Sequence, residues 1–520
     1  MAGISSVQGD YKKAAADFEK ALVLSREAKY PKGEARVLIG LADLNLNQGQ
    51  YNNAKALYDR SLKLFRKVGY LRGQSRVLYG IGELHLRQSQ YDQTRSAFEE
   101  SFLIAKQIGD SQAEGKALLG ICKLEMSLGN NGQARNSCEQ SLSLFKKTKY
   151  QRGEAEVIRV LGRIESSNYK PLEARSAFEK ALEISRHIKD KGGEAQSLLS
   201  LATTERILDR YSSAQNFYGE ALKIYQTLNE RVGQAKVLKG LGKLSSMQGY
   251  FKQARTYYQQ ALIVFQEMSD PRNKLKVIRS MAVLEARLEN HSLVEQYFQQ
   301  ALQICKEIGN QREEARTYLN YADLKSKTEK VEEAHSFLQK ALQLFTQLGD
   351  VFHQTHAWVM IANLERDTKH YQQASTSYEH ALNLLRFSEN SFYESPILQE
   401  ISYLEALQRH YQKAFILLNQ AEDLSRGFNN TRQLAGVLIV SGQIETLQKE
   451  YDKARNTYQK VMKILDEMGD VSLKIRVFNL LAKIEKETGN EKEAQRYEEL
   501  VLHLFKGSEK SPYLVSTLKP

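Results

Sequence analysis

Residues 235–261 read AKVLKGLGKLSSMQGYFKQARTYYQQA, and small and large apolar residues recur in this stretch at helical spacing. A first apolar face runs up to a polar turn at Gly249, which is suited to ending a helix. Ala254, Tyr258 and Ala261 follow at offsets of four and three residues, which place them on one face of a second helix. The stretch therefore predicts two helices joined by a short turn.

The same pattern recurs every 40 residues without insertion or deletion, and alanine occupies the position of Ala254 in eleven of thirteen units. A second position in each unit is always small: Ala42, Gly82, Cys122, Gly162, Ala202, Gly242, Ala282 and Ala322. A small residue lets the neighbouring helix axis come close, while an aromatic residue fills the space beside it. Between units, Gly109-Asp110 and Gly349-Asp350 offer glycine to end one helix and aspartate to start the next. The chain is predicted to be all-α.

Composition is consistent with a folded repeat array. The chain is 42% hydrophobic and 26% charged over 520 residues, and it contains only six prolines. No apolar run is long enough to cross a bilayer, and no secretory signal opens the chain. Three cysteines are too few for a disulfide framework, so we expect a reducing, cytoplasmic location, with the nucleus also compatible. A net charge of +12 favours acidic partners.

This pattern resembles the tetratricopeptide repeat (TPR) family. In one unit the resemblance is carried by Leu238, Leu241, Gly242, Gly249, Ala254, Tyr258 and Ala261, and Trp358 stands where the family often has tryptophan. A repeat of 40 residues instead of 34 is similar to kinesin light chains, Pins/LGN-type scaffolds and the TPR sensor arrays of signalling NTPases. The resemblance covers residues 1–506. It implies a right-handed superhelical solenoid of antiparallel helix pairs that binds protein segments.

The repeat register predicts three parts of the chain. Residues 1–34 hold an orphan second helix of a truncated first repeat, because the chain begins within a unit. Residues 35–506 hold twelve complete helix pairs, of which the last helix is a polar cap. Residues 507–520 are predicted to be a flexible tail.

The resemblance also implies where a ligand binds, since first helices line the concave groove of TPR arrays. The cationic residues expected to face that groove are Arg36, Arg76, Lys116, Lys123, Arg159, Arg163, Arg206, Lys236, Lys239, Lys243, Lys276, Arg279 and Arg316. Like charges on neighbouring units repel, so a ladder on one face favours an acidic ligand over chance. We expect a protein or peptide partner that carries Asp, Glu or phosphate, and no membrane insertion. The alternative is that these residues are ordinary solvated charges.

No pattern in the sequence predicts catalysis, a cofactor or a metal site. The glycines near Lys243 lack the spacing of a phosphate-binding loop. His353 and His356 could face one metal, but no third ligand accompanies them, so they are interpreted as solvated. Cys122 and Cys138 are interpreted as small packed residues without a redox role. Glutamates recur late in the first helices, at Glu125, Glu165, Glu205, Glu285, Glu365, Glu405, Glu445 and Glu485, and we expect them to pair with Arg, Lys or the backbone.

Three functions from different classes remain open at this point. A protein-interaction scaffold is the leading hypothesis. A ligand-sensing array detached from a signalling NTPase or effector module is the second, motivated by the start within a repeat. A nucleic-acid-binding helical repeat is the third, motivated by the basic pI of about 9.2. The third is disfavoured because the positions that would read bases, such as Ile39, Tyr79 and Leu119, form no code.

Overall fold

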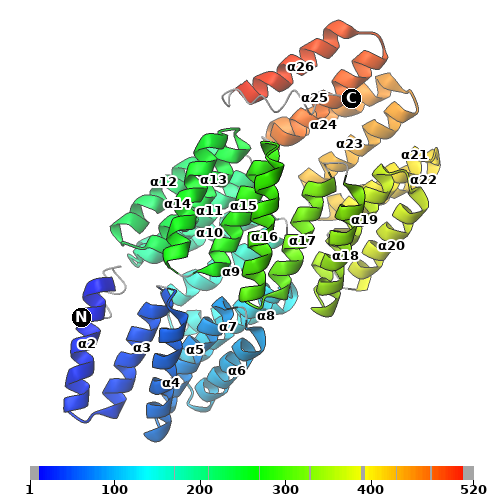
Figure 1. Cartoon of the computed structure of the whole chain (residues 1–520). Coiled ribbons are helices and arrows are strands. Elements are labelled where there is room, and N and C mark those ends of the chain that lie inside the picture. The colour runs from blue at the N-terminus through cyan, green and yellow to red at the C-terminus, as the bar shows by residue number, and fades with distance from the viewer. Residues whose placement is uncertain are drawn as a thin grey trace. The chain divides into compact units, whose positions relative to one another are not determined.

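The computed structural model describes residues 11–506, except residues 48, 89, 169, 209, 269, 327–329, 388–392, 429 and 469–470. These described residues form twenty-five helices and no strand, which confirms the all-α prediction (Figure 1). The predicted tail at 507–520 lies outside them. None of the described helices is both long and apolar enough to span a bilayer.

The helices belong to two compact units, divided within α15 after Met281; the short segment Met247–Tyr250, at the end of α13, belongs to the second unit. The first, unit 1, holds α2 (Tyr11–Glu27), α3 (Pro31–Asn47), α4 (Tyr51–Lys67), α5 (Leu71–Arg87), α6 (Tyr91–Gln107), α7 (Ser111–Leu128), α8 (Asn131–Lys147), α9 (Gln151–Ser167), α10 (Pro171–His187), α11 (Lys191–Ile207), α12 (Tyr211–Thr227), α13 (Arg231–Met247), α14 (Phe251–Glu267) and most of α15 (Pro271–Arg287).

The second, unit 2, holds the end of α15 and α16 (His291–Glu307), α17 (Gln311–Ser326), α18 (Val331–Gln347), α19 (Val351–Asp367), α20 (Tyr371–Phe387), α21 (Glu394–Leu407), α22 (Tyr411–Gly427), α23 (Thr431–Leu447), α24 (Tyr451–Met468), α25 (Val471–Glu487) and α26 (Glu491–Lys506). Most helices have 17 residues, whereas α21 has 14 and carries Pro396 in its first turn, where proline is tolerated.

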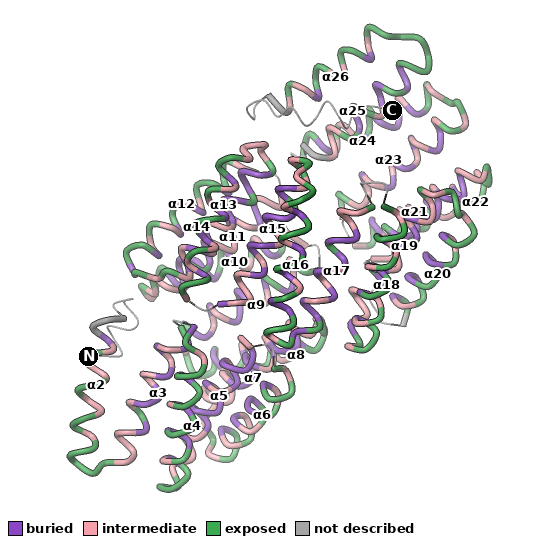
Figure 2. The backbone as a smooth tube through the Cα atoms, viewed as in Figure 1, coloured by how far each residue is buried: buried purple, intermediate pink, exposed green. Residues whose placement is uncertain are grey.

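Consecutive helices pack as pairs, and the predicted stripe of small and aromatic residues forms the core. Ala254 and Ala261 are 0% exposed and Tyr258 is 2% exposed, as the sequence pattern requires. The first helices α5, α7 and α9 are mostly buried or half-buried, while α4, α12 and α14 each keep a long exposed side (Figure 2). The apolar faces of both helices of a pair are thus shared with neighbouring units.

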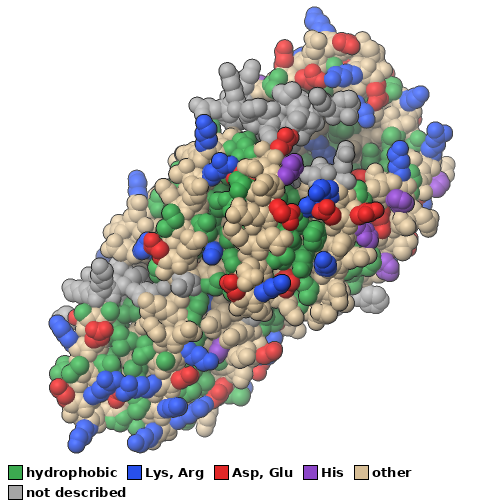
Figure 3. All heavy atoms as spheres, viewed as in Figure 1, with side chains coloured by type: hydrophobic (Ala, Val, Ile, Leu, Met, Phe, Trp, Pro, Cys, Tyr) green, Lys and Arg blue, Asp and Glu red, His purple; other side chains and the backbone are tan. Residues whose placement is uncertain are grey.

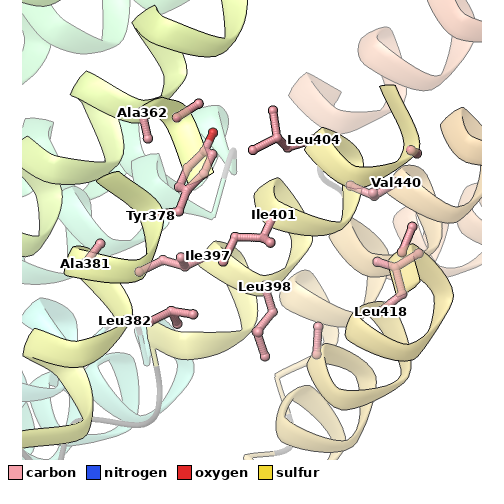
Figure 4. Packing of buried hydrophobic residues seen from close by; sticks show 14 of the residues in the cluster. Ala362, Tyr378, Ala381, Leu382, Ile397, Leu398, Ile401, Leu404, Leu418 and Val440 are labelled. Atoms are coloured by element: carbon pink, nitrogen blue, oxygen red, sulfur yellow. The ribbon is translucent and has the colours of Figure 1, made fainter. Parts of the chain in front are cut away.

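The same packing holds in unit 2. Tyr378, Ala381 and Leu382 of α20 face Ile397 and Ile401 of α21 within one buried cluster (Figure 4). Such clusters repeat along the chain, and each is built mainly from adjacent pairs. The small residues therefore set how closely the helices approach, and the rings fill the space that remains.

Turns and polar contacts follow the repeat as well. Gly109 and Gly349 adopt φ of +65° and +61°, the left-handed conformation that glycine tolerates. The carboxylates of Asp110 and Asp350 accept hydrogen bonds from the amides of Ala113 and His353, which caps the next helix as predicted.

A second contact within the pairs was not predicted. The hydroxyls of Ser61, Ser101 and Ser141 donate to backbone carbonyls 26 residues earlier, at distances of 2.7–2.8 Å. Each hydroxyl thereby joins the second helix of a pair to the first. A serine at this position satisfies its own buried polar group while it stays small.

Candidate functional site

Cations stand on successive turns of two first helices of unit 1, on the face that the TPR resemblance predicts to be the inner one. Arg159 and Arg163 lie four residues apart on α9, and Lys236, Lys239 and Lys243 lie three and four residues apart on α13. These spacings place each set on one side of its helix. We name Arg159, Arg163, Lys236, Lys239 and Lys243 the basic cluster.

Two further arginines meet the cluster because unit 1 curves back on itself. The Arg272 Nη1 of α15 donates to the Leu86 carbonyl at the end of α5, at 3.4 Å and 186 residues away in sequence. Burial lowers the pKa of Lys236, and the charge of Arg87 lowers it further. Burial and then the charge of Arg272 lower the pKa of Arg163. Helices α5, α9, α13 and α15 therefore converge on one region.

Burial and mutual repulsion depress the pKa values of the cluster. Burial, followed by the charges of Lys243, Lys236 and Arg279, lowers the pKa of Lys239 to about 7. Burial, followed by Arg206 and Arg279, lowers the pKa of Lys243 to about 8. The Lys243 side chain is nevertheless exposed, and that of Lys239 is half-buried. The ammonium groups of Lys239 and Lys243 are thus accessible to a ligand, although burial and neighbouring cations disfavour their charged forms.

Acidic side chains near the cluster are already engaged. Glu156 and Asp190 act on Arg159 electrostatically, but Glu156 accepts from Lys123 at 2.8 Å and Asp190 accepts from Arg152 at 3.1 Å. Asp270 accepts from the amide of Asn273 at 3.0 Å and from its side chain at 2.7 Å. Burial raises the pKa of Glu230, which weakens that carboxyl as a counter-charge.

No member of the basic cluster forms an ion pair within the described part of the chain. Arg159 is only 9% exposed, and among the described residues its Nη1 has no hydrogen-bond partner. A buried guanidinium donor without a partner costs roughly 1–3 kcal/mol. By contrast, Lys and Arg side chains are interspersed with Asp and Glu over α2, α3 and α4, at the lower left of Figure 3. The inner face therefore offers uncompensated positive charge.

Several predicted groove residues are held by other contacts. Lys123 binds Glu83 and Glu156, each at 2.8 Å; burial alone would lower its pKa, but these two charges raise it well above its usual value. Arg36 donates to the Tyr70 hydroxyl at 3.2 Å. The Lys116 Nζ lies over the Tyr150 ring, 5.1 Å from its centroid.

Arg316, in unit 2, binds Glu313 at 3.2 Å and donates to the His353 ring at 3.1 Å. Arg206 and Arg279 lie near enough for their charges to act on Lys243, and Arg76 acts similarly on Asp43 and Lys116. The position of Lys276 in the groove stays a prediction. Arg87 and Arg272 were not predicted, because their approach depends on the curvature of the array.

The recurrent glutamates form structural pairs, which confirms that prediction for most of them. Glu125, Glu205 and Glu485 bind an arginine 30 residues earlier, at 2.6–2.7 Å, and Arg135 pairs with Glu165 in the same way. Glu405 binds Lys413 at 2.6 Å. Glu445 differs, because burial raises its pKa and no ion pair to it occurs among the described residues.

Replacing Arg95 with methionine should lower the free energy of unfolding by about 2 kcal/mol, because the Glu125 carboxylate, whose side chain is 3% exposed, would keep only its bond from Asn130. Adding Glu125→Gln should recover part of that loss, since the neutral amide needs no counter-charge. Urea unfolding followed by circular dichroism measures both variants. Equal stability of wild type and Arg95→Met would contradict a structural role for the pair.

The cysteine interpretation is wrong in one respect. Cys122 of α7 and Cys138 of α8 are both 0% exposed, as expected of core residues, but they form a disulfide with their Cα atoms 5.4 Å apart. The two positions face each other across the helix pair at a separation that suits a disulfide. Cys305 is buried, and its Sγ lies 3.6 Å from the Thr317 hydroxyl.

The interpretation of His353 as solvated is also wrong. Its Nδ1 bonds the Asp350 carboxylate at 2.8 Å, and burial lowers its pKa. Asp350 also binds Arg312 at 2.6 Å, and the same Arg-to-Asp spacing recurs in Arg72–Asp110 and Arg152–Asp190, so this contact is structural. Within the described residues, no group of three or more His, Cys, Asp or Glu could hold a metal.

Several solved structures are similar to about two thirds of this chain. A Rap protein complexed with competence and sporulation factor matches with a TM-score of 0.52 and 12% identity, covering 69% of this chain and 99% of that chain. The apo quorum sensor NprR from B. thuringiensis matches with a TM-score of 0.44 and 15% identity, covering 70% and 99%. Aspartyl phosphate phosphatase F from Bacillus subtilis matches with a TM-score of 0.42 and 14% identity, covering 67% and 92%.

Family models agree with the repeat pattern. Residues 1–67 match the tetratricopeptide repeat model, and residues 153–469, more than half of the chain, match the MalT-like TPR region. No curated protein matches the sequence. With its helix pairs and its stripe of alanines and aromatic rings, the chain belongs to the MalT-like TPR family.

Proposed function

We propose that this protein is a protein-interaction scaffold that binds an acidic segment of a partner protein at the basic cluster of unit 1. One observation carries the proposal: five cations stand on successive turns of α9 and α13, and none of them forms an ion pair within the described residues. A folded protein ordinarily pairs or disperses such charges, because clustered cations repel one another. A ligand with negative charge would remove that repulsion.

The fold is suited to this role. A TPR array presents an extended surface, each part of which is supported by its neighbours. The Rap protein structure with the same fold was solved in a complex with competence and sporulation factor, which supports the use of this architecture for binding. The proposal assigns the chain no catalytic step and no cofactor, and it takes the cluster as the place of contact.

The test replaces Lys236, Lys239 and Lys243 with glutamate in the full chain. Binding of a fluorescein-labelled oligoglutamate peptide, measured by fluorescence anisotropy, should weaken by about a hundredfold or more, because three attractive charges become repulsive. Circular dichroism should show unchanged helix content, since the three side chains lie on the inner face and not in the apolar core.

A matched control variant makes the same change in net charge on the second helices of three pairs. Lys180, Lys223 and Lys252 are exposed residues of α10, α12 and α14, and their replacement by glutamate should leave peptide affinity within about twofold of wild type. Equal losses in both triple variants would reduce the effect to net charge and overturn the proposed site. Equally tight binding of a single-stranded RNA of matched charge would overturn the assignment to a protein segment.

A further inference from the structure

The cations of the inner face divide into two groups with different chemistry. The first, the arginine subsite, consists of Arg159, Arg163, Lys236 and Arg272. The Arg163 charge links them, because Arg159 and Arg272 act on Arg163 and Arg163 acts on Lys236. The second, the lysine subsite, consists of Lys239 and Lys243, with Arg279 near both. Lys236 and Lys239 lie one turn apart on α13 and join the two subsites.

The arginine subsite holds more positive charge than one carboxylate can neutralise. The Arg159 Nη1 and the Arg272 Nε are buried N–H groups with no hydrogen-bond partner among the described residues. Guanidinium groups match the oxygens of phosphate in a forked geometry. A phosphate monoester supplies close to two negative charges and three acceptor oxygens, enough to serve several of these donors at once.

The lysine subsite has a different character. Ammonium groups are compact point charges without a fixed fork, so a single carboxylate is sufficient as their partner. The Lys243 side chain is exposed and its neighbour Lys239 is half-buried, so this subsite is the more open of the two. An aspartate or glutamate of the ligand suits it.

The distance between the subsites sets the spacing within the ligand. Lys236 and Lys243 are seven residues apart on α13, which corresponds to about 10 Å along a helix that rises 1.5 Å per residue. An extended peptide advances about 3.3 Å per residue, so about three residues cover the same length. The two anionic groups of an extended ligand should therefore stand three positions apart.

We propose that the inner face of unit 1 recognises a phosphorylated protein segment, with a phosphoserine or phosphothreonine bound at the arginine subsite and an aspartate or glutamate three residues away bound at the lysine subsite. This inference rests on the proposed function, since it specifies the acidic segment. The phosphate fills the hydrogen-bonding capacity of Arg159 and Arg272, and the carboxylate sets the direction of the peptide along α13.

The test compares labelled peptides by anisotropy on the full chain: phosphoserine-x-x-Glu, its Asp-x-x-Glu analogue, its unphosphorylated Ser-x-x-Glu form, and phosphoserine-x-x-Gln. The first should bind about tenfold more tightly than each of the others, because each of them lacks one charge-assisted contact. Moving the glutamate three positions further from the phosphoserine should cause a similar loss. Inorganic phosphate should compete with the phosphopeptide.

Two protein variants separate the subsites. Arg163→Gln, at an exposed side chain, should remove the preference for phosphoserine over aspartate and keep the preference for glutamate over glutamine. Lys243→Gln should do the reverse. Because the peptide comparisons use wild-type protein, a variant that folds poorly does not decide the outcome.

The outcomes distinguish this inference from the proposed function. If the phosphoserine and aspartate peptides bind wild type equally tightly, and the Lys236/Lys239/Lys243 glutamate variant binds neither, the two-subsite inference is overturned and the scaffold proposal stands. Absence of binding by every acidic peptide overturns both. Equal effects of Arg163→Gln and Lys243→Gln on every peptide overturn the division into subsites.

Discussion

Gly82→Val is expected to lower the stability of unit 1 by about 3 kcal/mol, because the site has no room for a side chain. A Cβ atom at Gly82 would lie 2.5 Å from the Phe98 Cδ1 and closer still to its Cε1. Phe98 is 0% exposed, and a Cβ atom at Gly120 of α7 would lie 2.6 Å from the same ring, so the ring has no space into which to retreat. The close approach of α5 and α7 to this ring depends on glycine in both.

The measurement is the urea midpoint of unfolding followed by circular dichroism. Gly219→Ala is the matched control, since Gly219 lies inside α12 and a Cβ atom there would have no neighbour within 4 Å, and its substitution should stabilise the helix by roughly 0.5–1 kcal/mol. Combining Gly82→Ala with Phe98→Leu should cost less than the sum of the single changes, because the smaller side chain makes room. A Gly82→Val midpoint equal to wild type would contradict the close packing.

Affinity for an acidic peptide is expected to fall by roughly a hundredfold between pH 6 and pH 9, about tenfold for each of two lysines that lose their charge. The pKa of Lys239 is about 7 and that of Lys243 about 8 in the unbound protein. Below pH 6 both are charged and attract the ligand, and above pH 9 both are neutral. A bound anion favours the charged forms, so binding takes up protons between these limits.

The charged groups that face these two lysines are consistent with an affinity that falls as the pH rises. Lys239 is acted on by Lys243, Lys236 and Arg279, with Asp270 as the opposing charge, and Lys243 is acted on by Arg206 and Arg279. An oligoglutamate peptide suits the measurement, because its carboxylates stay ionised throughout this range. Titration calorimetry in two buffers of different protonation enthalpy would report the proton uptake directly.

Arginine at both positions is the matched control for this prediction. Lys239→Arg and Lys243→Arg keep a positive charge that is not lost at any pH in this range, so the double variant should bind with nearly constant affinity from pH 6 to pH 9. A flat profile in wild type, or an unchanged slope in the arginine variant, would show that these two amines do not contact the ligand.

The sequence predicted the features of the fold that repeat. The stripe of Ala254, Tyr258 and Ala261 is buried as expected, because each unit meets the same packing problem and solves it with the same residue sizes. The sequence predicted that the recurrent glutamates form ion pairs, but it did not identify the residue that each one binds. The spacing of 30 residues between Arg95 and Glu125 would have identified that partner, since it recurs in other units.

The binding surface could be predicted only in part, because its charges depend on contacts between units. Lys123 looked like its neighbours in the groove, yet Glu83 and Glu156 from two other helices bind it. Arg272 contacts Leu86 across 186 residues of sequence, so this contact joins distant repeats. Neither contact produces a recognisable pattern in the sequence around these residues. The disulfide likewise depends on how two core positions face each other, and three scattered cysteines do not show that.

The unpaired charge on the inner face also links folding to occupancy. With no ligand bound, the charges of Arg163 on α9 and Lys236 on α13 repel each other, and the apolar packing of each helix opposes that repulsion. A bound anion turns that repulsion into an attraction, and any ligand that binds only the folded state stabilises it. Under the proposed function, the partner would then act as a counter-ion that stabilises the folded state of unit 1.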